Sequence, residues 1–419
     1  MKAKFFLLKI VLIFILLNSQ LFSQLRPGKP EELPHRLFSL EDHIVPADSG
    51  YFNCYFTYKI AYDKLIFTKN GSQYTAAFYI DIEAVNTADD EIIRNSNENT
   101  VAVQDFNETE SEDRFLEGLL HFKLKSGNYD FRSSVTIQNK KAVSPDFVIE
   151  LSDSNKEILK PFIVAGFDSK NDVYVLQNDD AIPFSDSPGL LLIPASSDTV
   201  SSVGIKINQN EENVVNQTCN ESFLSDLTFE EQNNRVVFRK NEKGKFRIFI
   251  LKQGLKKLDE GFPKVSVEEK GSKPRIYSLP VKWLNKPLSL RNIDFSLKVM
   301  AKIQNDERLT KLEDKYDDEE LLHQYWKRFD PDTSSKYNEI MDLFFTRVDN
   351  AIRKFSTVDR KNGALTDRGM VYIKYGPADF TERSFTKDNT TVEVWVYDKL
   401  NKKFVFKDKS GLGNYQLMN

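Results

Sequence analysis

Two carboxylates and a guanidinium near the C-terminus have the chemistry of a functional site. Asp367 and Arg368 are adjacent, and Glu393 follows in an apolar run. A carboxylate and a guanidinium beside aromatic rings suit the binding of a sugar, a peptide terminus or another polar ligand. The candidate binding residues are Asp367, Arg368, Trp326 and Trp395. Asp367 with Glu393 is the pair that general acid–base catalysis would use.

The same motif has a structural interpretation. Thr366 or Asp367 is expected to hydrogen-bond the backbone of a tight turn that enters a strand. Arg368 would pair with a helix carboxylate such as Glu339. Gly369 would take a backbone angle that other residues resist. On this interpretation the motif positions the chain and binds nothing.

The other candidates also have structural alternatives. Trp326 and Trp395 would bridge helix and sheet in the core, and Glu393 would point to the open sheet face. Gly-Pro in Tyr375-Gly376-Pro377 would end a strand and fix a turn. The residues assigned to a structural motif are Gly363, Thr366, Gly369, Tyr375, Gly376 and Pro377.

Standard catalytic and metal-binding signatures are missing from the sequence. It has no G-x-x-x-x-G-K-[ST], H-E-x-x-H, G-x-S-x-G or C-x-x-C motif. The four histidines are dispersed, which argues against a histidine metal site or catalytic triad. Asp330 and Asp332 begin like a calcium loop, but the Gly and the closing Glu of an EF-hand are missing. We therefore assign no catalytic residue, no metal ligand and no cofactor.

The N-terminus has the pattern of a secretory signal peptide. Lys2, Lys4 and Lys9 precede or interrupt an apolar run at residues 10–17, and small or polar residues follow up to Ser23. The run is shorter than the ~20 apolar residues of a membrane span. We predict cleavage after Ser23 and export to the periplasm or cell surface, with no transmembrane segment in the mature chain. A retained N-terminal anchor is the alternative.

Charge and cysteine content limit the partners. Removal of the three leader lysines takes the formal net charge from -4 to -7, and the basic residues form no stripe. Nucleic acid is therefore not an expected partner. Cys54 and Cys219 lie far apart in the sequence. An oxidising compartment permits a disulfide between them, but two cysteines do not make a disulfide framework, so their pairing stays open.

Most of the chain has the alternating pattern of β-strands. Asn70-Gly71 between two such runs predicts a hairpin, and short strands with regular turns predict sandwiches. The stretch 208–234 is rich in Asn and Glu and is expected to be the least structured part. The predicted segments are a signal peptide at 1–23, an extended arm at 24–48, Ig-like β-sandwiches at 49–152 and 153–285, and an α+β domain at 286–419.

In the last of these segments the hydrophobic period changes from two to 3.6 residues. We expect one helix near residues 290–301 with Asn292 as its N-cap, a second with an acidic start at 317–320, and a third at 337–355. Three strands at 370–375, 391–397 and 403–407 would follow as an antiparallel meander. The fold class is therefore multidomain and mainly β, with helices on a small sheet at the C-terminus.

Several stretches of the C-terminal third share a pattern with a known family. They are Gly363-Ala364-Leu365-Thr366-Asp367, Tyr375-Gly376-Pro377, Tyr325-Trp326-Lys327-Arg328-Phe329-Asp330-Pro331 and Gly411-Leu412-Gly413-Asn414-Tyr415. These stretches resemble the C-terminal domain of the GWxTD family of exported bacterial proteins. The family has no assigned activity, so the resemblance implies an address and an architecture but no reaction. Where the family has Trp in its motif, this chain has Ala364. A lost indole would remove either a ligand contact or a packing surface.

We expect a non-catalytic binding, assembly or scaffolding protein of the bacterial cell envelope. Its partner would be an envelope protein or a polysaccharide. The alternative is an enzyme, such as a hydrolase, that acts on envelope polymers with the carboxylates of Asp367 and Glu393. A deep groove that holds both carboxylates would favour the enzyme, and a well-packed face would favour the binding protein.

Overall fold

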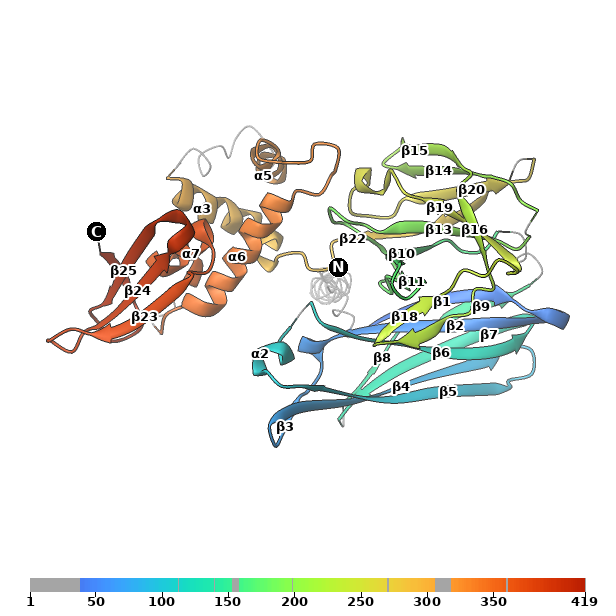
Figure 1. The fold of residues 1–419 in the computed structure, drawn as a ribbon, viewed down its shortest axis with the longest axis horizontal. Helices are drawn as coiled ribbons and strands as arrows, with labels where there is room; N and C mark the ends of the chain where they lie inside the picture. Colours follow the sequence, from blue (N-terminus) through green and yellow to red (C-terminus); the bar gives the residue numbers. More distant parts are fainter. Residues whose placement is uncertain are drawn as a thin grey trace, which may run out of the picture. The chain divides into compact units, whose positions relative to one another are not determined.

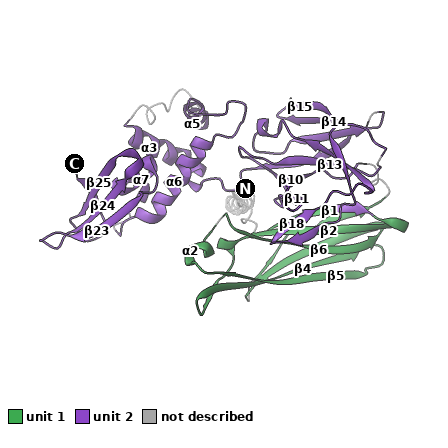
Figure 2. Ribbon diagram, viewed as in Figure 1, with its two compact units in different colours: residues 1–43, 47–152 green, residues 44–46, 153–419 purple. Residues whose placement is uncertain are grey.

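A computed structural model describes residues 38–111, 113–138, 140–152, 158–197, 199–269, 271–305, 318–358 and 361–418. The chain divides into two compact units (Figure 2). Unit 1 is Met1–His43 with Ala47–Ser152, and unit 2 is Ile44–Pro46 with Asp153–Asn419. The predicted signal peptide and residues 24–37 of the predicted arm lie outside the described residues.

Unit 1 contains two antiparallel sheets. The first has the order β1 (Ser39–Pro46), β2 (Tyr51–Ala61), β6 (Phe115–Lys125). The second has the order β3 (Thr68–Asn70), β4 (Gln73–Asn86), β7 (Gly127–Ile137), β8 (Lys140–Val143), with β5 (Ile92–Val103) paired to β4 and β9 (Phe147–Leu151) paired to β7. The short helix α2 (Phe106–Thr109) follows β5. Residues 39–46 are thus a strand, although the sequence suggested an extended arm.

The sheets of unit 1 pack through aromatic side chains. Phe56 of β2 and Phe131 of β7 are fully buried, with ring centroids 4.7 Å apart. The predicted hairpin is confirmed, because Asn70 pairs with Gln73 around Gly71, whose φ is +61°. Cys54 lies in this core as a free thiol, and burial raises its pKa to about 12, with a smaller contribution from Asp42.

The first part of unit 2 is also a β-sandwich. A seven-stranded sheet runs β16 (Ser222–Ser225), β19 (Phe246–Leu251), β13 (Leu190–Ala195), β10 (Phe162–Asp168), β11 (Val173–Leu176), β18 (Arg235–Phe238), β17 (Glu230–Gln232). A four-stranded sheet runs β15 (Glu212–Cys219), β14 (Val203–Gln209), β20 (Lys264–Glu269), β21 (Arg275–Ser278), and β12 (Ile182–Pro183) pairs with β22 (Val281–Lys282). One buried cluster joins the two larger sheets, with Leu191 and Phe249 on one side and Ile205 and Val267 on the other.

The expectation for residues 208–234 was wrong. This stretch contributes β15, β16 and β17. In β15 the polar side chains are exposed, while Val215 and Cys219 are buried against the core. Polar composition therefore concealed strands with only one buried face.

The last part of unit 2 is an α+β domain with helices against one four-stranded sheet (Figure 1). The helices are α3 (Ile293–Gln304), α5 (Asp318–Lys327), α6 (Glu339–Phe355) and α7 (Asp367–Tyr375). The sheet has the order β23 (Phe380–Phe385), β24 (Thr391–Tyr397), β25 (Lys402–Asp408), β26 (Gln416–Met418). Asn292 caps α3 as expected, through its side-chain bond with the N–H of Phe295.

Residues 370–375 form the end of helix α7, so the predicted strand there was wrong. Their β-branched and aromatic side chains favour a strand. The helix begins because the Thr366 hydroxyl accepts a hydrogen bond from the N–H of Gly369, at 3.1 Å. Val371, Tyr372 and Ile373 are then all buried on the helix. The cap and the core together override the local preference of the segment.

None of the helices in the described ranges is both long enough and apolar enough to span a membrane. The described part of unit 2 also contains four short 3-10 turns. They are η4 (Leu255–Lys257), η5 (Leu288–Arg291), η6 (Gly363–Leu365) and η7 (Asp398–Leu400). Turn η6 matters most for the candidate site, because it leads directly into the cap of α7.

Candidate functional site

The start of α7 is held by one hydroxyl and two tightly packed glycines. The Thr366 hydroxyl donates to the carbonyl of Gly363 at 2.7 Å while it accepts from the N–H of Gly369. A Cβ atom on Gly363 would lie 2.1 Å from the carbonyl oxygen of Ala351. A Cβ atom on Gly369 would lie 1.8 Å from the carbonyl oxygen of Gly363. Neither position has room for a side chain.

This geometry corrects the reason given for Gly369. The sequence suggested a backbone angle that only glycine tolerates, but Gly369 lies inside a right-handed helix and has no positive φ. The close approach of the Gly363 carbonyl excludes other residues instead. Gly376 does have a positive φ of +82°. It ends α7, and its carbonyl accepts a hydrogen bond from the Tyr397 hydroxyl at 2.9 Å.

The Arg368 side chain contacts several other segments of the domain. Its Nη1 lies 3.1 Å from Oε2 of Glu393, and its Nη2 donates to the carbonyl of Gly413 at 3.3 Å. Its guanidinium lies 3.9 Å from the ring centroid of Tyr415 and 5.2 Å from that of Phe355. The side chains of Arg368 and Glu393 are only 15% and 17% exposed. Helix α7, strand β24 and the C-terminal segment therefore meet at this guanidinium.

Two expectations for this group were wrong. Arg368 pairs with Glu393 and not with Glu339, which lies in the first turn of α6. Glu393 does not point to the open face of the sheet. It alternates in phase with Trp395 on β24, and the indole Nε1 of Trp395 donates to its carboxylate. Since Trp395 is 3% exposed in the helix-covered core, Glu393 lies on the same covered face.

Asp367 contacts a different part of the chain. Its Oδ2 accepts a hydrogen bond from the N–H of Leu417 at 2.8 Å. That bond ties the start of α7 to strand β26. Both carboxylates thus have hydrogen-bond partners: Asp367 bonds to a backbone N–H, and Glu393 bonds to Arg368 and Trp395. Each carboxylate stabilises a separate link to α7.

Asp408 is a further polar residue of the site that the sequence did not single out. Its carboxylate accepts hydrogen bonds from the N–H groups of Ser410, Gly411 and Gly413, at 2.7–3.2 Å. Burial alone would raise the pKa of Asp408, but these N–H donors and the Ser410 hydroxyl lower it below its ordinary value. The carboxylate fixes the loop that carries Gly413 and Tyr415 to Arg368. An aspartate shortly before two closely spaced glycines was the available signal.

Both candidate tryptophans lie in the core of the domain. Trp326 of α5 is 5% exposed, and its ring centroid lies 4.9 Å from that of Phe344. Its indole Nε1 is buried without a hydrogen-bond partner among the described residues. Trp395 packs against Phe355 and Phe406 at 5.4 and 4.9 Å. The structure therefore places Trp395 beside Glu393 and Arg368, and it places Trp326 elsewhere in the same core.

Tyr375 and Ala364 also pack inside the domain, whereas Pro377 is exposed. Tyr375 packs on Tyr397 and Phe404, with ring centroids 5.8 and 5.2 Å apart. Ala364 is fully buried in the cluster that contains both tryptophans. A larger side chain at position 364 would therefore face the core.

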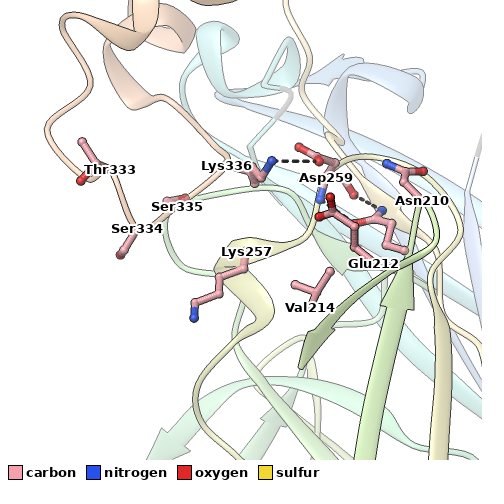
Figure 3. A pocket seen from close by; sticks show the side chains of 10 residues that line it. Asn210, Glu212, Val214, Lys257, Asp259, Thr333, Ser334, Ser335 and Lys336 are labelled. Carbon is pink, nitrogen blue, oxygen red and sulfur yellow. Dashed lines mark hydrogen bonds and ion pairs between the residues drawn. The ribbon is translucent and has the colours of Figure 1, made fainter. Parts of the chain in front are cut away.

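One pocket of about 290 Å3 lies away from these residues, between the β-sandwich of unit 2 and the loop before α6 (Figure 3). Its lining is mostly polar and includes Gln209, Glu212, Lys257, Asp259, Ser334 and Lys336. Lys336 Nζ lies 3.3 Å from Oδ2 of Asp259, and both side chains are about half exposed. Among the residues that the structure covers, no three His, Cys, Asp or Glu side chains are grouped to hold a metal ion.

Comparison with known proteins agrees with the geometry of the C-terminal domain. Residues 289–419 match the GWxTD domain. The chain carries a GWxTD domain. The match begins just before α3 and includes the whole sheet β23–β26. Arg368 and the residues that it contacts therefore lie inside the GWxTD domain.

The other comparisons are less informative. No curated protein matches the sequence. Among solved structures, the C-terminal domain of the Streptococcus pyogenes antigen I/II-family protein AspA is similar over 58% of this chain and 99% of its own. Its sequence identity is 9% and its TM-score is 0.18. A likeness this distant carries no argument about the present chain.

Substitution of Gly369 by Ala tests the close packing at the start of α7. The added methyl has no space beside the Gly363 carbonyl, so we expect the GWxTD domain to lose about 3 kcal/mol or more. Tryptophan fluorescence during urea unfolding reports on this domain, because Trp326 and Trp395 are two of three tryptophans. Gly166→Ala in strand β10 is the control, since that position has open space and an ordinary φ, and circular dichroism follows its effect because it lies outside the GWxTD domain. Equal effects of the two substitutions would contradict the packing argument.

Acid should loosen the loop that Asp408 holds. A carboxyl whose folded-state pKa is lowered adds stability above its unfolded pKa of about 3.9, and this stability is lost as the pH falls through the folded pKa. We therefore expect Asp408→Asn to be less stable than the wild type at neutral pH. The difference in stability between the wild type and this variant should become smaller below pH ~4. Thermal unfolding of both proteins over a range of pH measures this difference. A difference in melting temperature that does not change with pH would refute the role of Asp408.

Proposed function

We propose that this protein is a non-catalytic binding or assembly protein of the bacterial cell envelope. The observation that supports this function best is that the polar side chains of the motif are bonded to other parts of the same domain. Arg368 bonds to Glu393 and to the carbonyl of Gly413, and Asp367 accepts a hydrogen bond from the N–H of Leu417. Side chains that are bonded to one another in this way stabilise the domain and do not form an open ligand site. We therefore expect the protein to bind its partners through the outer surface of its domains.

The envelope address rests on the N-terminal sequence. A charged start, a short apolar run and the small residue Ser23 are typical of an exported protein. Two β-sandwiches before the GWxTD domain suit a spacer or a binding surface outside the cytoplasm. The expected partners are an envelope protein or a polysaccharide. The expected mature N-terminus is Gln24.

The alternative function is an enzyme, such as a hydrolase, that acts on envelope polymers. Asp367 and Glu393 would supply the acid and the base in that case. The contacts of the two carboxylates weigh against it, since Glu393 is paired with Arg368 and Asp367 with the N–H of Leu417. The pocket of unit 2 is lined by none of these residues.

A double variant separates the two functions. Asp367→Asn with Glu393→Gln removes both acids but keeps their shape and most hydrogen-bond acceptors. We expect the tagged wild type and the variant to capture the same crosslinked envelope partners from native cells. Purified protein should release no product from peptidoglycan or envelope polysaccharide. Tryptophan fluorescence and the melting temperature establish that the variant is folded.

Turnover of an envelope polymer would contradict the proposal if the folded double variant lost it. A catalytic acid or base contributes about 10²- to 10⁴-fold in rate, so the loss would be easy to see. Protein that stays in the cytoplasmic fraction would contradict the envelope location. Envelope protein that still begins at Met1 would contradict only the predicted cleavage and indicate a retained anchor.

A further inference from the structure

Among the described residues, helices lie on one face of the sheet of the GWxTD domain and leave the other face open (Figure 1). Trp395 and Tyr397 of β24 point into the helix-covered core. Neighbouring side chains on a strand point to opposite faces, so Val392, Val394 and Val396 point to the open face. All three are half-buried by their neighbours on the sheet.

The apolar surface continues onto the neighbouring strands. Val394 lies directly opposite Val405 of β25, and Val405 lies opposite Met418 of β26. Phe380 of β23 lies opposite Val396. Met418 and Phe380 are 42% and 58% exposed. We call this surface the open valine face; it comprises Phe380, Val392, Val394, Val396, Val405 and Met418.

A sheet face of this composition is unusual when it meets water. The exposed face of an antiparallel sheet normally carries polar side chains, and a strand that is apolar on both faces is typical of a sheet covered on both. Strand β24 has Trp395 and Tyr397 on one face and three valines on the other. A contiguous apolar patch on a protein surface marks an interaction site.

We propose that the open valine face packs against the same face of a second copy of this chain. The face carries charges that fit a copy of itself. Glu382 lies on β23, to one side of the valines, and Lys403 and Lys407 lie on β25, to the other side. In the register of the sheet, Glu382 is level with Val405, between the levels of Lys403 and Lys407.

A two-fold axis along β24 places these charges opposite one another. Such an axis exchanges the positions of β23 and β25 between the two stacked sheets. Each Glu382 then comes to lie between Lys403 and Lys407 of the other copy, and the valines stack at the centre. Two-fold dimers use one self-complementary surface on both subunits, and packed sheets align within about 30°. Lys407 also lies 3.6 Å from Asp388 within its own chain.

Pairing through the exposed edge of β23, the longer of the two edge strands of this sheet, is another way in which two copies could associate. A symmetric antiparallel pair places residues from the same face opposite each other. Its two best-overlapped registers therefore put Glu382 opposite Glu382 or Arg383 opposite Arg383. Like charges directly opposite are destabilising, and charged edges protect sheets from such pairing. Charge thus disfavours the edge and favours the face.

The proposed dimer does not depend on the proposed envelope function, and it can be tested with the purified protein alone. Sedimentation velocity over a concentration series should show a monomer–dimer equilibrium for the wild type. Val394→Glu should weaken the dimer roughly 100-fold or more, because it places a carboxylate among the valines. Val358→Glu is the matched control, since Val358 is 80% exposed outside the sheet. That substitution should leave the dimer unchanged.

Charge exchange tests the orientation without disturbing the fold, since the side chains lie on the surface. Glu382→Lys or Lys403→Glu alone should weaken the dimer about tenfold or more, and the two together should restore it. A wild type that is monomeric up to about 100 μM would overturn the proposal. So would a dimer that persists in folded Val394→Glu protein, or single charge reversals with no effect.

Discussion

The contact between the Arg368 guanidinium and Glu393 is the interaction on which the GWxTD domain depends most. A guanidinium that is 15% exposed needs an anion and hydrogen-bond acceptors, and this one has the carboxylate of Glu393 and the carbonyl of Gly413. The rings of Tyr415 and Phe355 lie near it. Through these contacts the side chain joins helix α7 to strand β24 and to the last residues of the chain.

The neighbouring motif residues make this contact possible. Thr366 starts α7 at a fixed point by capping it, and Gly363 and Gly369 let two backbone segments touch. Asp367 and Asp408 then bind N–H groups on either side of Tyr415. A sequence that looks like a ligand site is, in this domain, a set of links between segments far apart in the chain. The surface left for partners is the remainder of the domain, including the open valine face.

Much of the architecture was predictable from the sequence, because it rests on patterns of local side chains. The Asn70-Gly71 hairpin, the Asn292 cap and the strand at 391–397 all follow from turn, cap or alternation signals. The prediction of a strand at 370–375 was wrong because the Thr366 cap and the burial of Val371, Tyr372 and Ile373 on the helix together outweigh the β-preference of these residues. Strand β23 was missed because all six of its side chains are exposed, so it has no buried alternation.

The site was harder to predict because its partners depend on the fold. The sequence identified Asp367, Arg368 and Glu393 as chemically interesting, but no local pattern pairs Arg368 with a residue 25 positions away. Asp408 was missed because three of its donors are backbone N–H groups, those of Ser410, Gly411 and Gly413, and the only sequence signal is the spacing of the two glycines after it. The role of Gly369 also depended on the position of Gly363, which only the folded chain defines.

A double-mutant cycle on Arg368→Gln and Glu393→Gln tests most directly whether the motif holds the domain together. The free energy of unfolding would be measured by tryptophan fluorescence for the wild type, both single variants and the double variant. We predict a coupling energy of about 1 to 3 kcal/mol between the two side chains, because each single substitution leaves the other group without its partner in a largely buried site. Additive effects, with a coupling energy near zero, would contradict the account.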